Sequence, residues 1–372
     1  MTCGVVMKKL ERRDFLKKAA VAAVGSGALI SACGNEQKKE GAAIISNEKF
    51  EWRMVTAWPP HFPILGEGAD KLSKNIDEMS GGRLKIKVYG GRELVPALES
   101  FDAVSQGVAE MCHSSAYYWA GKSPAAQFFS GIPFGMNTHQ AYSWIFNGGG
   151  LELWREVYEP FNLIPFPAGG TGGQMGGWFN RQINSVSDLK GLKMRIPGIG
   201  GKVLNKAGGS SVLSAGGEIY TNLERGVIDA AEWAGPYHDY LMGFHKIAKY
   251  YYYPGWQEPA SFIELIVNKN SFNKLPDDLK KIVETAATAH CTKMVSEFEV
   301  KNVEYYKKLA EEEKVDFRKF PEDVLKILRK YNDEVVKEII ELDQISKKVY
   351  ESYSSYQKLT SKWSEIAEKN YM

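Results

Sequence analysis

Through the first two thirds of the chain, short stretches of alternating apolar and polar residues are separated by stretches with helical spacing. Alternation with a period of two predicts strands with one buried face, and spacings of three and four predict amphipathic helices. Strands and helices that follow one another in this way are typical of βαβ construction and predict an α/β fold. The predicted strands are 51–58, 83–89, 109–114, 192–196, 227–233 and 262–267, and the predicted helices are 65–79, 94–107, 138–158, 200–207 and 220–225.

Two segments interrupt this alternation. Residues 163–179 are dense in Gly and Pro, and residues 254–268 begin with Pro and Gly before they reach the last predicted strand. Glycine within a strand often marks a place where another backbone or a ligand approaches closely. A chain of 372 residues is long enough for two lobes at roughly 150 residues each. We therefore expect both segments to cross between two lobes and to line a cleft.

The last quarter of the chain is predicted to be almost wholly helical. Residues 277–313 form one predicted helix, and apolar residues recur at steps of three and four through 322–370. A continuous helix of about 45 residues would be near 70 Å long, which exceeds one lobe. Part of it would then pack on a partner chain. The alternative is a broken helix that folds back on its own lobe, and the spacing favours neither.

The amino-terminal residues distort the charge of the chain. The formal net charge is +2, but the first 33 residues hold six Lys and Arg against two Asp and Glu, which leaves 41 basic and 43 acidic residues in the remainder. A remainder with a net charge of −2 gives no basic surface for nucleic acid. Aromatic residues make up 12% of the chain, which suits either a thick core or a cleft for a small ligand.

The first 33 residues have the features of an export signal. A basic segment with Arg12 and Arg13 precedes a short apolar stretch that is too weak to span a membrane, and it resembles the twin-arginine export motif. The sequence Leu-Ile-Ser-Ala-Cys at 29–33 resembles a bacterial lipobox, in which Cys33 is acylated. The alternative is an ordinary signal peptide that is cut near Ala32. Residues 34–48 are small and polar and suit a tether.

Cysteines and short motifs exclude several other classes. Apart from Cys3 and Cys33 only Cys112 and Cys291 remain, and we expect two buried thiols rather than a disulfide. The glycines at 198–201 and 169–177 lack the spacing of a phosphate loop or of a dinucleotide fingerprint. The six histidines form no short metal-binding spacing, and no G-x-S-x-G elbow is present. These absences argue against the common hydrolase, dehydrogenase and nucleotide-binding classes.

One arginine stands at a position suited to binding. Arg195 lies near the end of the predicted strand 192–196, which Pro197 and Gly198 close. Ligands of open α/β sheets bind beyond the carboxyl ends of strands, and an arginine there can offer two parallel donors to a carboxylate. The alternative on the strand alone is a solvated charge. Glu232, which ends another apolar strand, would need a partner if it is buried.

Several linked segments make residues 50–314 resemble the extracytoplasmic solute receptors of tripartite ATP-independent periplasmic (TRAP) transporters. DLKGLKMRIPG at 188–198 is similar to a segment of that family whose arginine binds a carboxylate, and this arginine falls on Arg195. GEIYTNLERGVIDAAEW at 217–233 is similar to a second family segment, although Asn222 and Ala230 depart from it. The resemblance implies a two-lobed α/β fold of the periplasmic-binding-protein type II, with hinge crossings and a long carboxy-terminal helical extension.

Within that family, finer details resemble the receptors for small 2-oxo and 2-hydroxy monocarboxylates. The resemblance implies substrate contacts, a cation of sodium or calcium beside the ligand, no catalysis, delivery to membrane permease subunits and a homodimer formed through the carboxy-terminal helix. The implied substrate-binding residues are Arg195, Gln174, Tyr117, Tyr118, Trp233 and Trp178, and the implied cation ligands are Gln174, Glu232, Trp233 through its carbonyl, and Gln257. Oxygen ligands of this kind are those that hard cations prefer.

The expected organisation has a lipid anchor as its only link to a membrane. Three alternatives stay open: a TRAP receptor for a larger carboxylate without metal, an exported enzyme that uses the same cleft, and a structural lipoprotein that acts through its tail helix. The expected parts are a twin-arginine lipoprotein signal at 1–33, a tether at 34–48, a first lobe at 49–165 and 254–295, a second lobe at 166–253 and 296–320, and the extension at 321–372.

Overall fold

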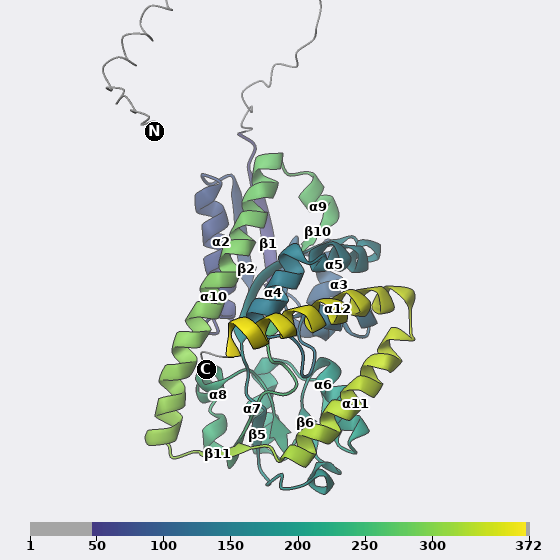
Figure 1. Cartoon of the computed structure of the whole chain (residues 1–372). Coiled ribbons are helices and arrows are strands. Elements are labelled where there is room, and N and C mark those ends of the chain that lie inside the picture. The colour runs from purple at the N-terminus through teal and green to yellow at the C-terminus, as the bar shows by residue number, and fades with distance from the viewer. Residues whose placement is uncertain (1–46, 370–372) are drawn as a thin grey trace, which may run out of the picture. The chain divides into compact units, whose positions relative to one another are not determined.

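The structure, a computed structural model, describes residues 47–369, and these fold around two sheets that form two lobes (Figure 1). The twin-arginine motif and Cys33 lie outside the described residues. The first sheet has the order β2-β1-β3-β10-β4, with β1 (Phe50–Thr56), β2 (Leu84–Tyr89), β3 (Met111–Ser114), β4 (Leu163–Gly172) and β10 (Ser261–Asn268). The second has the order β11-β9-β5-β8-β6-β7, with β5 (Gly177–Phe179), β6 (Lys193–Arg195), β7 (Ser210–Val212), β8 (Ala230–Ala231), β9 (Tyr250–Tyr253) and β11 (Asp316–Lys319).

Both sheets are mixed, as crossings between lobes require. In the first sheet β1 pairs in parallel with β2 and β3, whereas β10 pairs antiparallel to both β3 and β4. All eight residues of β10 are buried, because it lies inside the sheet with a layer on each face. In the second sheet β6 runs parallel to β8 and β7, so their carboxyl ends face the same edge.

Helices cover both sheets, and one of them serves both lobes. α10 runs 35 residues, about 50 Å, and packs on α2 and β4 of the first lobe and on α8 of the second (Figure 1). Gly169 of β4 permits α10 to pack closely on this strand, since a Cβ at position 169 would lie 2.4 Å from the sulfur of Met294 in α10. The α-helices are α2 (Gly66–Met79), α3 (Ser100–Ser105), α4 (Thr138–Asn147), α5 (Gly150–Tyr158), α6 (Gly198–Lys206), α7 (Gly216–Glu224), α8 (Pro236–Leu241), α9 (Lys269–Asn273), α10 (Asp277–Glu311), α11 (Glu322–Ile340) and α12 (Gln344–Ala367). Short 3₁₀ turns occupy Ala97–Glu99, Ala116–Trp119, Pro124–Phe129, Glu159–Phe161, Val186–Leu189 and Phe244–Lys246.

Most predicted elements are present, and the differences have physical reasons. The Gly- and Pro-rich stretch was expected to cross between lobes from 163, but its first ten residues are β4, a buried strand that pairs with β10. The crossing itself is limited to 173–176. The predicted strand 227–233 is reduced to two residues, β8, and the predicted helix 94–107 to a 3₁₀ turn and α3. β11 was missed because its sequence, Asp-Phe-Arg-Lys, is mostly charged.

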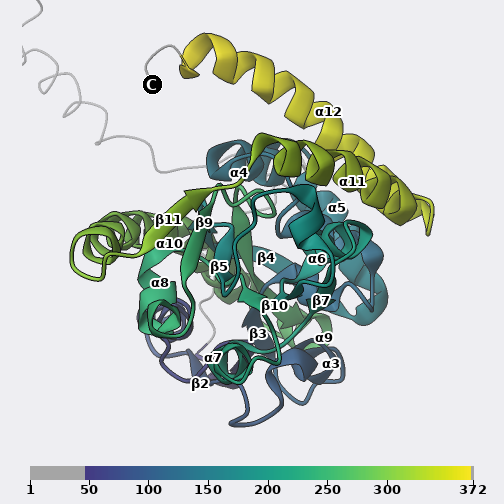
Figure 2. The same cartoon turned by 90° about the horizontal axis from the view of Figure 1, so that it is seen from below.

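The carboxy-terminal helix is broken, so the continuous form of about 45 residues was wrong. α11 ends at Ile340, and Asp343 then caps α12 by accepting a hydrogen bond from the Ser346 N–H at 2.7 Å. The two helices meet at this turn (Figure 2). α12 returns to its own first lobe, where the Tyr353 hydroxyl accepts from the Met136 N–H at 2.8 Å. The structure therefore has the alternative form, a broken helix that folds back on its own lobe.

Two further observations concern the cysteines and the length and hydrophobicity of the helices. Cys112 and Cys291 are both free and buried, which confirms the expectation of two thiols rather than a disulfide. Within residues 47–369, no helix is long and apolar enough to cross a membrane.

Candidate functional site

A small cavity lies between the two lobes. The free space in it is small, because its own lining side chains nearly fill it. The lining residues come from both lobes and from the first crossing: Trp58, Leu65, Tyr117, Tyr118, Thr171, Gln174, Trp233, Ala234, Ser261 and Ile263. A wider groove lies beyond Trp58, between the loop at 57–60 and the start of α7.

Arg195 and Glu232 meet because two parallel strands end side by side. Arg195 ends β6 and pairs in register with Ala231, the last residue of β8, so Glu232 directly follows the neighbouring strand. Both side chains are only 1% exposed. The Arg195 Nη1 donates to the Glu232 carbonyl at 2.6 Å and to its Oε2 at 3.2 Å. The prediction that Glu232 would need a partner is therefore confirmed.

One edge of the Arg195 guanidinium remains available for a ligand. Nη2 makes only a long contact of 3.4 Å with the Tyr118 hydroxyl, and the buried Nε has no hydrogen-bond partner among the described residues. Nε and Nη2 form the side-on edge that binds a carboxylate through two parallel hydrogen bonds. Burial lowers the pKa of Arg195, but Tyr118 and Glu232 outweigh this effect and hold it above its ordinary value. The group is therefore charged and has two donors to offer.

The two crossings bring Gln174 and Gln257 to the same place. The two crossings pack so closely that a Cβ on Gly255 would lie 2.2 Å from the Gln174 carbonyl oxygen. The Gln257 Nε2 donates to the Met175 carbonyl at 2.9 Å, and the Met175 N–H donates to the Ala234 carbonyl at 3.0 Å. The segments that carry Gln174, Glu232 and Gln257 are thus joined by hydrogen bonds.

Buried oxygen atoms gather where these segments meet. Within residues 47–369, the Oε1 atoms of Gln174, Glu232 and Gln257 and the Oε2 of Glu258 have no hydrogen-bond partner. Buried acceptors in native proteins are almost always satisfied, so a group of them calls for a donor or a cation. Burial raises the pKa of Glu232 to about 7 despite the opposing charge of Arg195.

The donor types decide which ions would fit. Carboxylate and amide oxygens suit sodium or calcium, whereas transition metals favour imidazole and thiolate. Among the described residues, no group of three or more His, Cys, Asp or Glu is placed to hold a metal. A cation at this point would therefore depend on the amide oxygens of Gln174 and Gln257. The residues present fit such an ion.

The aromatic residues predicted for the site divide into two groups. Tyr117, Tyr118 and Trp233 line the cavity, and burial raises the pKa of both tyrosines, so their hydroxyls stay protonated. The Trp233 ring lies 5.1 Å from the Arg195 guanidinium carbon. Trp178 is not brought to the cavity. Its indole N–H donates to Asp239 at 3.1 Å within the second lobe, and its ring stacks on Tyr251.

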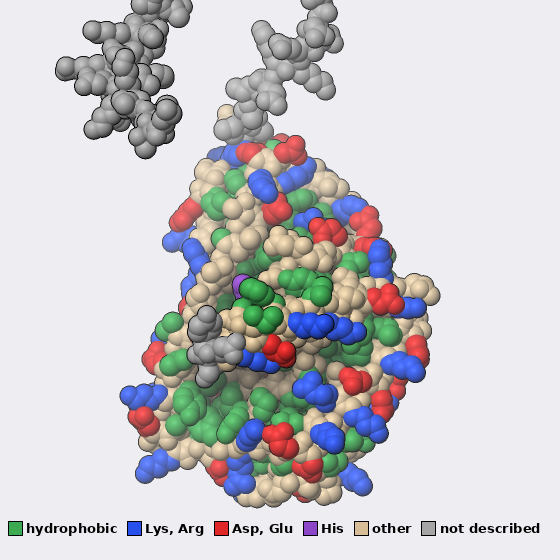
Figure 3. Space-filling model, viewed as in Figure 1, with side chains coloured by type: hydrophobic (Ala, Val, Ile, Leu, Met, Phe, Trp, Pro, Cys, Tyr) green, Lys and Arg blue, Asp and Glu red, His purple; other side chains and the backbone are tan. Residues whose placement is uncertain are grey.

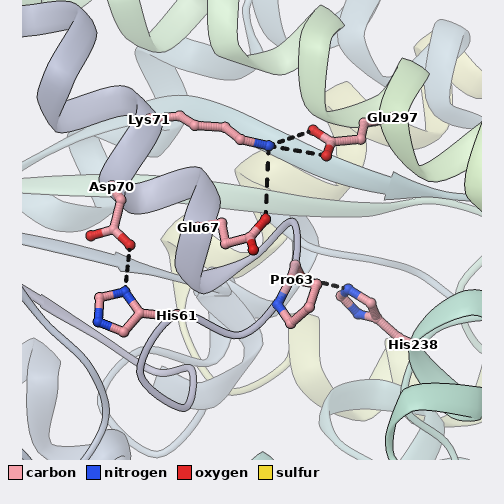
Figure 4. Close-up of polar contacts among 7 residues, drawn as sticks. All are labelled: His61, Pro63, Glu67, Asp70, Lys71, His238 and Glu297. Carbon is pink, nitrogen blue, oxygen red and sulfur yellow. Dashed lines mark hydrogen bonds and ion pairs between the residues drawn. The ribbon is translucent and has the colours of Figure 1, made fainter.

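A loop of the first lobe lies against the second lobe beside the cavity. The His238 Nε2 donates to the Pro63 carbonyl at 2.7 Å (Figure 4). The centroid of the Phe62 ring is 4.7 Å from that of His238 and 6.2 Å from that of Trp233. Close by, Lys71 of α2 forms an ion pair with Glu297 of α10 (Figure 4). Burial lowers the pKa of His238 to about 3, so the ring is neutral and its contact is a plain hydrogen bond.

Four polar or aromatic residues at or beside the cavity were missed in the sequence. Trp58 is the second residue beyond β1, at the carboxyl end of a parallel strand where ligands bind, and this position could have identified it. Glu258 adjoins Gln257, but a lone glutamate in a loop gives no signal. Thr171 and Ser261 are common residue types whose place in the cavity depends on how β4 and β10 pair.

Comparisons with known proteins agree with this geometry. A family described as bacterial extracellular solute-binding protein, family 7, matches residues 54–343. A monocarboxylate 2-oxoacid-binding periplasmic protein of Nostoc sp. is 41% identical over 364 residues, which cover 97% of this chain and 98% of the relative.

Two solved structures carry ligands and share the fold. A TRAP periplasmic solute-binding protein of Pseudoalteromonas atlantica with bound sodium and pyruvate has a TM-score of 0.85 and 43% identity, and the match covers 87% of this chain and 98% of that one. A TRAP solute-binding protein of Bordetella bronchiseptica, a dimer with calcium and picolinate in one site, has a TM-score of 0.85 and 36% identity, with coverage of 87% and 96%. The predicted two-lobed fold is confirmed by these likenesses.

Proposed function

Because the chain belongs to the bacterial extracellular solute-binding proteins of family 7, the receptors of TRAP transporters, we propose that it captures a small 2-oxo or 2-hydroxy monocarboxylate together with a cation. Membership of this family also confirms the expectation of a periplasmic receptor rather than an enzyme. The ligand class is supported by the relatives that bind 2-oxoacids or pyruvate.

Arg195 would hold the carboxylate of the ligand. Its Nε and Nη2 point one edge of the guanidinium away from Glu232, and neither atom has a strong hydrogen bond among the described residues. The protonated hydroxyls of Tyr117 and Tyr118 can donate to the ligand oxygens from the first lobe. Trp233 and Trp58 lie edge to face and would enclose the apolar end of a short acid.

Gln174, Glu232 and Gln257 would hold the cation through side-chain oxygens, with the Trp233 carbonyl as a further ligand. A bound hard cation would supply a positive charge that attracts the carboxylate and the neighbouring 2-oxo or 2-hydroxy oxygen of the substrate together. This is why the 2-position matters in the proposal, because a simple fatty acid lacks the second oxygen. The chain's own residues bind and orient the ligand, and they make or break no bond.

Closure of the two lobes would enclose the ligand and create the surface that the permease recognises. The contacts of Phe62 and His238 join the lobes beside Trp233, so the ligand site and the closed form share residues. A ligand that binds the closed form better shifts the population toward it. Delivery to TRAP permease subunits follows from the family.

The single observation that carries the proposal is the group of unpartnered buried oxygens beside the available edge of Arg195. The test is a thermal-shift and calorimetry panel of pyruvate, lactate, a longer 2-oxo acid, propionate and succinate, each with and without chelator. Pyruvate or another 2-oxo or 2-hydroxy acid should raise the melting temperature only when a cation is present, because ligands stabilise by mass action. Succinate binding that survives chelator would favour a receptor for larger carboxylates, and turnover of a bound acid would favour an enzyme.

Export and anchoring are proposed on the sequence alone. Residues 1–33 would direct twin-arginine export, Cys33 would carry the lipid, and residues 34–48 would tether the receptor to the membrane. Labelling with a radioactive fatty acid should mark the wild type and not Cys33→Ala. A Cys33→Ala protein that stays in the membrane fraction would contradict the anchor.

We further propose a homodimer through residues 321–372 and the lobe boundaries given above. The dimeric relative supports the assembly, and so does the end of α12, where hydrophobic side chains gather on the face seen in Figure 3. Leu359, Trp363 and Ile366 there are 63–71% exposed. Light scattering should report a dimer for the wild type and a monomer for a chain with all three changed to Ser.

A further inference from the structure

The indole of Trp58 stands between the ligand cavity and the wider groove that lies beyond it. Trp58 lines the cavity together with Tyr118 and Trp233. It also lines the groove, whose other side is the start of α7 at Gly216. Trp58 is only 2% exposed, so the ring is enclosed on both sides. One buried side chain therefore separates the two spaces.

Trp233 completes this wall from the second lobe. The two indole rings meet edge to face, with centroids 6.3 Å apart and planes inclined at 81°. The far edge of the Trp233 ring reaches α7, because a Cβ on Gly216 would lie 2.5 Å from the Trp233 Cη2. The wall thus consists of one ring from each lobe and is complete where the lobes meet.

Hydrogen bonds hold Trp58 in this orientation. Its indole N–H donates to the His113 Nδ1 at 3.0 Å, and the His113 Nε2 donates to the Ala168 carbonyl at 3.2 Å. Burial lowers the pKa of His113 to about 3, so its ring is neutral and Nδ1 can accept. The Trp58 carbonyl accepts from the Gly91 N–H at 2.6 Å. The ring cannot swing aside without breaking a buried hydrogen bond, which is unfavourable.

The groove beyond Trp58 suits an apolar tail. It reaches the surface at Arg92 and Glu218, which form an exposed ion pair at 3.8 Å. Most of its other lining residues are small or apolar, among them Ala57, Pro59, Pro60, Ala97, Ala215 and Gly216. Each methylene that leaves water for such a surface raises affinity about fourfold. A longer acid would therefore gain affinity if its tail could reach the groove.

We propose that Trp58 sets the length limit of the ligand, because it closes the cavity to 2-oxo acids with longer tails. The inference deepens the proposed function, since it concerns the tail of the same ligand. A carboxylate held by Arg195 places the tail against the two indoles, because the Trp233 ring lies 5.1 Å from the Arg195 guanidinium carbon. A tail that extends past them has to displace Trp58 and break its hydrogen bond to His113.

The test is the affinity of full-length receptor for unbranched 2-oxo acids of three to eight carbons, measured by calorimetry with saturating calcium or sodium. Wild type should bind 2-oxohexanoate at least about 10-fold more weakly than pyruvate. In Trp58→Ala the ratio of the two Kd values should fall by at least about 10-fold, and affinity should keep rising toward eight carbons. A wild-type affinity that does not fall with chain length, or a smaller change of the ratio in Trp58→Ala, would overturn the proposal.

Three further variants keep the result interpretable. Leu65 lines the cavity but not the groove, so Leu65→Ala should admit one or two more carbons and no longer tail. Trp154 is a buried indole of the first lobe that stacks on Phe129, and Trp154→Ala should lower the melting temperature without changing the ratio.

Trp58→Phe keeps a ring but removes the N–H that binds His113, so it should relax the length limit in part. If Trp58→Ala does not fold, an unchanged limit in Trp58→Phe would refute the role of Trp58. Absence of pyruvate binding by wild type with either ion would instead refute the proposed function, and it would leave no length series to measure.

Discussion

Two buried glutamates of this chain look alike until their partners are compared. Glu264 in the first lobe is 0% exposed and Glu232 at the cavity is 1% exposed, and burial raises the pKa of each to about 7. Glu264 accepts from Ser114 at 2.9 Å, from the Trp119 indole at 2.6 Å and from the Tyr158 hydroxyl at 2.8 Å. Glu232 has Arg195 on one oxygen and, among the described residues, nothing on the other.

The difference teaches that neither burial nor a perturbed pKa identifies a binding site here. Glu264 lies within one sheet, where β10 pairs with β3, and its partners all belong to the first lobe. Glu232 lies where two lobes and two crossings meet, so its environment is completed only when something enters the cavity. An unsatisfied acceptor at such a meeting point is the more informative sign.

The largest expected effect is on ligand affinity through Arg195. Arg195→Ala should weaken pyruvate binding by about 2–5 kcal/mol, roughly 30-fold to several thousandfold, because the substrate carboxylate would be buried without its partner. Calorimetry with cation present measures it. Arg318→Ala is the control, since Arg318 pairs with Asp316 on β11 of the same sheet, away from the cavity. Near-normal affinity of Arg195→Ala would remove the arginine from the site.

The next effect concerns stability and tests Glu264, the glutamate whose two carboxyl oxygens both accept hydrogen bonds. The folded pKa of Glu264 is about 7 against an ordinary 4.5, so its contribution is fully present below pH 4.5 and is lost as pH rises through 7. Wild type should therefore lose up to roughly 3 kcal/mol of unfolding free energy relative to Glu264→Gln between pH 4.5 and 8. Urea unfolding of both ligand-free proteins measures it. A difference that does not change with pH would contradict the raised pKa.

A smaller effect separates the two glutamates directly. Glu232→Gln should lower pyruvate affinity about 10- to 100-fold and reduce the bound cation, because an amide oxygen replaces a charged ligand. Glu264→Gln should leave affinity and ion content unchanged. Elemental analysis and calorimetry on the same samples give both values. If the two variants behaved alike, the contrast between satisfied and unsatisfied carboxyls would have no functional meaning.

The parts that the sequence predicted well are those set by local pattern. The alternation in 83–89 became β2, the helical spacing after 277 became α10, and the arginine near the end of 192–196 did end a strand. These features depend on residues close together in the chain. The family resemblance added the order of Gln174, Arg195, Glu232 and Gln257, and the structure brings the segments of these four residues together.

What the sequence did not predict depends on long-range packing. Glu258 and Ser261 belong to the site only because the return crossing packs against the first one, and the run 163–172 is a strand only because β10 covers it. Trp178 was expected at the ligand, but the pairing of β5 with β9 sets it against Tyr251. The break at Asp343 was visible as a capping residue, although the apolar spacing continues across it.

The smallest expected effect tests whether closure and binding share residues. Phe62 of the first lobe touches Trp233 and His238 of the second, whereas Phe161 makes an equivalent edge contact with Phe101 inside the first lobe. Both rings are half-buried. An aromatic contact of this kind contributes about 0.5–1.5 kcal/mol beyond its buried area. Phe62→Ala should therefore weaken pyruvate binding by about 2- to 10-fold, since the closed form loses a contact that the open form lacks. Phe161→Ala should lower the melting temperature and leave the affinity unchanged, because its contact is the same in both forms. If both variants lost affinity equally, the loop at 59–65 would stabilise the fold in general and would not couple the ligand to closure.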